Sequence, residues 1–398
     1  MSGFGGALRR LRQEKGMSLT QLATATSYSK GYLSRLERGA RPATAEIARV
    51  CDSALDADGQ LIAVLRDSAA ARAEQKSLLG LLSASDVSRF WADRPRSDAH
   101  VYAEQLEMIF KALRAMGHRM SPELVLPMLL THDETAQHVV KSAEPGDRDE
   151  LLRLIARIKE YAGWMAQEAG QVDLAERLTE EARHIALATG NSDLAQWALV
   201  RFADIALYRG DGAKIVNLTR GILERRDIEL RTRSIAWQRQ AQGHALLGDR
   251  SSCMRALDQA RVFHEADQAE LGVQTLGTLS VRRPVETTRG WALVDLCAHE
   301  EAAEELHQVI PELDPESVRS RVRYTARLAL ACASSGDPER ACDLVRAALP
   351  DIDRVDSDTV RVDLKALAGL LRRRWSGNSS VSDLLAELRS QVGWIRFG

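Results

Sequence analysis

The stretch from Ser18 to Gly39, SLTQLATATSYSKGYLSRLERG, reads as two short helices joined by a tight turn. The first helix has an apolar edge that begins with Leu19 and Leu22. Ser18 is a good N-cap for it, because a serine hydroxyl accepts a hydrogen bond from one of the unpaired N–H groups at a helix start. Gly39 suits the left-handed residue that commonly ends a helix. The pattern therefore predicts a helix, a turn and a second helix within 22 residues.

The second helix differs from the first in its two faces. Ser29 is its N-cap candidate, and Leu33 and Leu36 predict an inward face. The outward face carries polar and basic side chains: Lys30, Tyr32, Ser34 and Arg35. Two short helices, the second with basic and polar groups exposed, have the layout that enters a DNA major groove.

The same run resembles the lambda-repressor/Cro-like helix-turn-helix family, also known as the xenobiotic-response-element family, in its LA, YLSRLERG and final-glycine signature. The resemblance implies a five-helix DNA-binding domain over residues 1–66, and an internal ion pair between Arg12 and Glu37. It also implies that Lys30, Gly31 and Arg35 read bases. The full set of expected DNA contacts is Ser29, Lys30, Gly31, Tyr32, Ser34, Arg35, Arg38 and Arg41.

The distribution of charge also separates the predicted N-terminal domain from the rest of the chain. Up to residue 50, nine basic and three acidic residues leave +6, so the rest carries −8 within the total of −2. A basic module on an acidic body indicates a polyanion as the partner of the module alone. Apolar spacing predicts the remaining helices of this module at residues 4–15, 43–55 and 60–66.

Composition favours an all-α protein of more than one domain. The chain has 398 residues, with 45% hydrophobic, 28% charged and only 5% aromatic residues, and it is rich in helix formers. The five cysteines form no CxxC pair, and we expect them to be small buried residues of a reduced, cytoplasmic protein. There is no run of 18 apolar residues and no apolar leader, so no membrane partner is expected.

After a predicted linker with a helical segment at residues 67–97, a repeat extends over residues 98–398. Five segments share a turn that lies five residues before a small or apolar residue. These residues are Ala175, Ile215, Cys253, Ala303 and Ala341, and twelve positions upstream lie Gly163, Ala203, Ala241, Trp291 and Ala329. Small residues at such offsets let antiparallel helices pack closely, and stacked pairs bury a continuous core. The pattern predicts a tetratricopeptide-like α-solenoid, with an insertion at residues 271–290 and a capping helix at residues 381–392.

A helix-turn-helix module followed by such repeats resembles actinobacterial regulators and the peptide-pheromone receptors of Gram-positive bacteria. The resemblance implies that the solenoid binds a signal on its concave face and mediates dimerisation.

The phase of the repeat places aromatic, amide and charged side chains on that concave face. The candidate ligand residues are Trp164, Gln167, Trp197, Arg201, Asp204, Tyr208, Gln238 and Gln242. This mixture suits a peptide or a small molecule, which needs apolar pockets as well as donors and acceptors. The alternative is that the tryptophans belong to the core and that the charges are ordinary surface.

No catalytic arrangement is visible. The nine histidines are scattered without ligand spacing, and no GxSxG, phosphate-binding or dinucleotide-binding motif occurs. We therefore expect no enzyme activity, no metal and no cofactor. Two hypotheses remain: a dimeric transcription regulator that binds a double-stranded DNA operator and senses an effector, and a scaffold whose solenoid docks a partner protein. Lys30 and Arg35 favour the regulator, because a scaffold needs no bases on that helix face.

Overall fold

The structure, a computed structural model, describes residues 4–26, 28–37, 45–57, 59–64, 99–267, 276–277 and 281–391. The chain divides into two compact units, residues 1–94 and 95–398. Every regular element in the described ranges is a helix and none of these residues belongs to a strand, so the all-α prediction is confirmed. The predicted linker at residues 67–97 lies outside the described residues.

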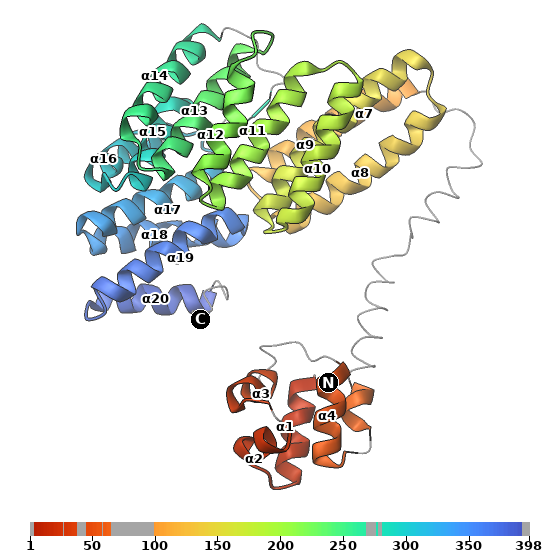
Figure 1. Cartoon of the computed structure of the whole chain (residues 1–398), viewed down its shortest axis with the longest axis vertical. Helices are drawn as coiled ribbons and strands as arrows, with labels where there is room; N and C mark the ends of the chain where they lie inside the picture. The colour runs from red at the N-terminus through yellow and green to blue at the C-terminus, as the bar shows by residue number, and fades with distance from the viewer. Residues whose placement is uncertain are drawn as a thin grey trace. The chain divides into compact units, whose positions relative to one another are not determined.

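The first unit is a small helical domain. Its helices are α1 (Phe4–Glu14), α2 (Leu19–Thr26), α3 (Lys30–Glu37) and α4 (Ala45–Leu55) (Figure 1), and residues 60–64 are also helical. The core joins all five segments through Leu8, Leu22, Leu33, Leu36, Ile47, Cys51 and Leu61. The predicted inward face of the second short helix is thus confirmed, because Leu33 and Leu36 are fully buried.

Two local features fix how these helices begin and cross. The Ser18 hydroxyl accepts from the Gln21 N–H at 3.2 Å, and the Gln21 side chain accepts from the Ser18 N–H at 2.8 Å. This reciprocal cap confirms the predicted start of α2. Gly5 lets α1 lie directly on the end of α3, since a Cβ atom there would be 2.7 Å from the Glu37 carbonyl oxygen.

The second unit is built from successive helix pairs (Figure 1). The first helix of each pair, in chain order, is α7 (Ala99–Gly117), α9 (Pro145–Glu168), α11 (Ser192–Tyr208), α13 (Leu230–Leu246), α15 (Pro284–Asp295), α17 (Val318–Ser335) or α19 (Asp358–Arg374). Their partners are α8 (Pro122–Ser142), α10 (Val172–Ala188), α12 (Gly212–Leu223), α14 (Arg250–Ala266), α16 (His299–Val309), α18 (Pro338–Val355) and α20 (Ser379–Gln391), and a 3-10 turn, η1 (Ile310–Glu312), follows α16.

The predicted repeat corresponds to these pairs. A Cβ atom at Gly163 in α9 would lie 2.9 Å from the Thr179 hydroxyl in α10, which is the close approach that the small residues were expected to allow. The intervening turns place Gly170, Gly210 and Gly248 at φ between 71° and 75°. Only glycine adopts this conformation without steric cost.

In the fourth repeat the register of the helices differs by one residue from the predicted one. Its left-handed turn residue is Cys297, at φ 58°, so the equivalent of Ala341 is Ala302 and not Ala303. Twelve residues upstream of Ala302 lies Gly290, where a Cβ atom would meet Leu306 at 2.8 Å. The missing turn glycine concealed this register. Cys297 is also exposed, so the expectation that all cysteines are buried is wrong at this position.

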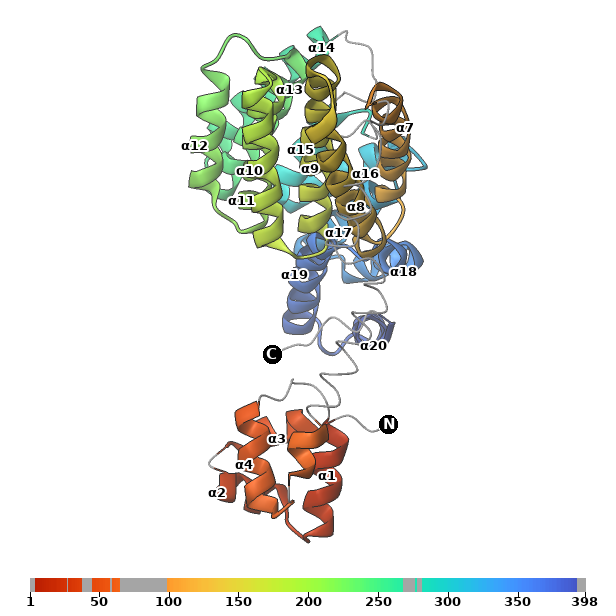
Figure 2. The same cartoon turned by 90° about the vertical axis from the view of Figure 1, so that its right-hand side faces the viewer.

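The first helices of the pairs close into a ring. Each of α9, α11, α13, α15, α17 and α19 contacts the next, and α19 in turn contacts α9 (Figures 1 and 2). The concave face of the predicted solenoid therefore lies on the inside of this closed series of helices.

The predicted insertion supplies part of this enclosure. Within residues 271–290, α15 already begins at Pro284, while Leu276 is buried in the core beside Trp197. The predicted capping helix is present as α20. Among the described residues, no helix is long and apolar enough to cross a membrane.

Candidate functional site

The first candidate site is the exposed face of α3. Ser29, Lys30 and Gly31 are exposed at its start, and Ser34 is half-buried. Arg38 and Arg41 lie outside the described residues, as do the side chains of Tyr32 and Arg35. The DNA contacts expected at all eight positions remain predictions.

An ion pair holds α3 against α1. Arg12 Nε donates to Glu37 Oε1 at 2.5 Å and Arg12 Nη2 donates to Glu37 Oε2 at 3.0 Å, with both side chains largely buried. Arg12 also donates to the Met17 carbonyl at 2.7 Å, at the start of the turn before α2. The hydrogen bond to Glu37 raises the pKa of Arg12. The pair that the family resemblance implied is confirmed, and it fixes the end of α3 to the rest of the unit.

The second candidate site is a cavity inside the ring of the second unit. Seven of the eight predicted ligand residues line it, all except Gln238. Its volume is about 140 Å³, measured as the space open to the centre of a water molecule. That space holds roughly ten waters, at 10–15 Å³ for each.

Gln238 does not line the cavity but contacts a residue that does. Its side-chain amide donates to the Ser234 hydroxyl at 3.3 Å and its carbonyl accepts from the Thr288 hydroxyl at 3.0 Å. Thr288 itself lines the cavity. Gln238 therefore orients a wall residue, and the structure gives it no direct place in the cavity.

Hydrogen-bonded charges cross the cavity wall from helix to helix. Asp204 of α11 accepts from Arg201 at 2.5 Å and from Arg239 of α13. Arg201 also donates to Gln167 of α9 at 2.7 Å. On the neighbouring side, Glu160 of α9 accepts from Arg157 at 2.7 Å. These contacts tie three successive first helices together at the level of the cavity.

Glu168, at the last turn of α9, closes the ring. It accepts from Arg319 at 3.0 Å and from Arg323, both on α17. It also accepts from Ser357 at 2.5 Å and from Thr359 at 3.2 Å, at the start of α19. Burial alone would raise the pKa of Glu168, but the charges of Arg323 and Arg319 and the Ser357 hydrogen bond outweigh burial and lower it to about 2.

Aromatic rings form two clusters on the cavity wall. Tyr161 and Trp164 have ring centroids 5.2 Å apart, and Trp291 makes edge contacts with Tyr208 at 5.9 Å and Tyr324 at 6.2 Å. Such edge-to-face arrangements suit aromatic quadrupoles, and the Arg327 guanidinium lies over the Trp291 ring, 3.9 Å from its centroid.

Trp197 combines the two roles that the sequence left open, a core residue and a residue of the ligand site. It is only 4% exposed and packs in the core, yet it also lines the cavity. Its indole N–H donates to Glu160 at 2.8 Å. A tryptophan in this position supports the wall as well as forming it.

Several wall residues were not anticipated. They include Arg114 from α7, His118 from the turn directly after α7, Tyr161, Arg239, Tyr324 and Gly277. Tyr161 lies three residues before Trp164, so helical spacing could have indicated it. The residues of α7 and Gly277 carried no such signal, because they come from outside the aligned repeats. The Arg114 side chain donates to the Gly277 carbonyl at 3.2 Å, across 163 positions of sequence.

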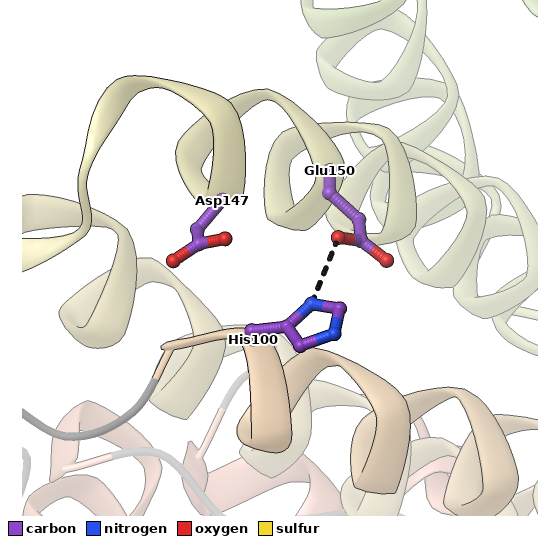
Figure 3. Close-up of side chains that lie close together, drawn as sticks. All are labelled: His100, Asp147 and Glu150. Atoms are coloured by element: carbon purple, nitrogen blue, oxygen red, sulfur yellow. Dashed lines mark ion pairs between the residues drawn. The ribbon is translucent and has the colours of Figure 1, made fainter.

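One exposed cluster has ligand-type side chains. His100 of α7 faces Asp147 and Glu150 of α9, with possible ligand atoms within 4.8 Å of one another (Figure 3). His100 lies 3.7 Å from Glu150 and 3.7 Å from Glu104. These separations are those of solvent-exposed ion pairs and exceed the distances of roughly 3.3 Å between ligands that share a tetrahedral zinc ion.

Comparison with known proteins supports the first site. Residues 4–65 match the family model of a helix-turn-helix domain. Residues 4–65 of the first unit therefore form a helix-turn-helix domain. No curated protein matches the chain in sequence.

A solved structure covers most of the chain at low similarity. It is Bacillus thuringiensis PlcR in complex with the peptide PapR7 and DNA, with 13% identity and a TM-score of 0.29. The match covers 89% of this chain and 95% of that one. A TM-score this low does not establish a common fold.

Proposed function

We propose that the protein is a sequence-specific DNA-binding transcription regulator, dimeric on its operator, whose second unit senses a peptide or small molecule. The observation that carries the proposal is the helix-turn-helix domain at residues 4–65, in which the buried Arg12–Glu37 pair presents the start of α3 to solvent. A helix of this kind contacts only a few base pairs, so useful affinity needs two half-sites related by a two-fold axis.

The proposal is tested by selecting binding sites from random duplex DNA with the full chain. The expected product is an inverted repeat whose half-sites lie about one helical turn, or a multiple of it, apart. Sedimentation of the complex should show two chains on one site. Recovery of no enriched sequence would refute the proposal and favour a scaffold.

Arg35→Ala tests the reading helix. If Arg35 grips a guanine edge, the variant should lose about 1–3 kcal/mol on the selected site and should relax its preference at one base position. Arg10→Ala is the matched control, because Arg10 is an exposed arginine of the same unit that pairs with Glu14 at 3.7 Å. Equal losses for Arg35→Ala on selected and random DNA would show that it contacts phosphate only.

The sensing part of the proposal is supported by the cavity. A ligand there alters DNA affinity only if it binds two states of the protein unequally. A tenfold change in operator affinity needs about 1.4 kcal/mol of such coupling, which one buried aromatic contact can supply. Operator titration with and without cell extract, on wild type and on Tyr208→Ala, tests it. A full response in the variant would place sensing elsewhere.

A further inference from the structure

The size of the cavity limits its ligand. Ten waters at about 30 Å³ each correspond to roughly 300 Å³ of molecular volume, at the lower end of small-molecule pockets. A sphere of that volume is about 8 Å across, and an extended chain covers about 3.3 Å per residue. The enclosed space thus accommodates about two or three residues of a peptide, or one compact small molecule.

The charges on the wall favour an anion. Three carboxylates serve five arginines: Asp204 pairs with Arg201 and Arg239, Glu168 with Arg319 and Arg323, and Glu160 with Arg157 while lying 4.0 Å from Arg201 Nε. Arg114 also lines the cavity, whereas Arg319 lies behind it, so the wall itself carries five arginines and three carboxylates. His118 adds none near neutral pH, because burial, together with the charges of Arg114 and Arg319, lowers its pKa to about 4.

Two donors within this network are unused. The Nε atoms of Arg201 and Arg323 are buried and make no hydrogen bond with any described residue. Arg201 as a whole is only 5% exposed, and both arginines line the cavity. Neither Nε atom is accessible to a water molecule, so a ligand reaches it only if a neighbouring side chain moves. Leaving a buried donor unpaired costs about 1–3 kcal/mol, and more for a charged group, so such a movement onto a ligand acceptor would be favoured.

The apolar part of the wall selects a flat group. The rings of Trp164, Trp291 and Tyr324 line the same cavity as Arg201 and Arg323. Aromatic walls favour a ring stacked or set edge-on against them.

We infer that the cavity holds one small organic anion with a flat, apolar ring, bound through the shared arginines and the aromatic wall. This inference rests on the sensing role proposed above and names the class of its ligand. A peptide longer than about three residues would extend beyond this space. A neutral ligand would leave the five arginines of the wall with only its three carboxylates.

The test compares two probes of equal shape on the full-length protein by isothermal titration calorimetry. The first is 2-naphthoate, and the second is its neutral amide, 2-naphthamide. We expect naphthoate to bind at least about tenfold more tightly, which is about 1.4 kcal/mol. Arg239→Gln, which removes one shared arginine, should weaken naphthoate about tenfold and leave the amide unchanged. Arg209→Gln is the control, since Arg209 pairs with Glu176 on the exposed surface.

Equal affinity for the two probes would overturn the inference, because the aromatic wall alone would then select the ligand. Failure of both to bind at about 1 mM would overturn it too, since that limit corresponds to only about −4.1 kcal/mol. The wild-type comparison stands even if Arg239→Gln does not fold. Because no DNA is present, a negative result here leaves operator binding intact, and failure of operator selection leaves this result intact.

Discussion

Replacing Glu168 by glutamine tests whether one carboxylate holds the ring closed. Glu168 is fully buried and accepts hydrogen bonds from two arginines of α17, from the hydroxyl of Ser357 just before α19 and from the hydroxyl of Thr359 in α19. Glutamine keeps the shape but removes the charge, so Arg319 and Arg323 stay buried without a counter-charge. Breaking a buried pair in this way costs about 3–5 kcal/mol.

The pKa of Glu168 gives a second estimate of how much its contacts stabilise the fold. A fall from 4.5 to about 2 corresponds to about 3 kcal/mol, at roughly 1.4 kcal/mol per pKa unit. The folded-state pKa is depressed, so this stabilisation is fully present above pH 4.5 and is lost as the pH falls towards 2. The wild-type unfolding free energy should therefore decrease over this window more steeply than that of Glu168→Gln.

The assay is urea unfolding of the full chain followed by tryptophan fluorescence. All seven tryptophans lie beyond residue 90, so the signal does not come from the helix-turn-helix domain. Glu301→Gln is the matched control, because Glu301 accepts two hydrogen bonds from Arg250 but both side chains are 48% exposed. Such a surface pair is worth about 0–1 kcal/mol. A loss for Glu168→Gln no larger than that for Glu301→Gln would refute the reasoning.

Three further predictions concern single contacts. Glu37→Ala should destabilise the helix-turn-helix domain by about 3–5 kcal/mol, because it leaves the buried Arg12 charge uncompensated; calorimetry of the full chain should show only the transition of that unit shifting, and an unshifted transition would contradict the role of the pair. On α12, Gly212→Ala should lower the free energy of unfolding by about 1–3 kcal/mol, because its Cβ atom would lie 2.6 Å from a backbone carbonyl oxygen of α13. Gly221→Ala meets nothing within 4 Å and should raise that free energy by about 0.5–1 kcal/mol. Urea unfolding should therefore give changes of opposite sign, and equal changes would show that the distance between the two helices can adjust. Cys297→Gly should stabilise the second unit by about 1 kcal/mol, since a left-handed conformation strains any residue with a Cβ atom. Thermal unfolding tests this, and a lower melting temperature would mean that a contact of the thiol stabilises the fold by more than the backbone strain costs.

The helices and their pairing could be predicted because their signals are local. Ser18 and its cap partner lie within one turn, and Leu33 and Leu36 repeat at helical spacing, so their burial followed from the sequence. The repeat was visible because small residues recur wherever two helices approach, as at Gly163. The same periodicity predicts seven of the cavity residues, all of them on first helices of the pairs. Where the turn glycine was replaced by Cys297, the signal was lost and the register slipped by one residue.

Only the tertiary structure decided that the second unit closes on itself. Closure depends on Glu168 meeting Arg319 and Ser357, which lie 151 and 189 positions away, and no periodic pattern joins residues so far apart. Each helix pair is rotated by a small angle relative to the one before it, and the packing of the whole array sets that angle. Six such rotations determine whether the array stays open or forms a ring. For the same reason Arg114 and Gly277 reach the cavity from outside the repeats. The sequence by itself determined which faces of the helices are polar, whereas the closed packing turned one of those faces into an enclosed, arginine-rich chamber.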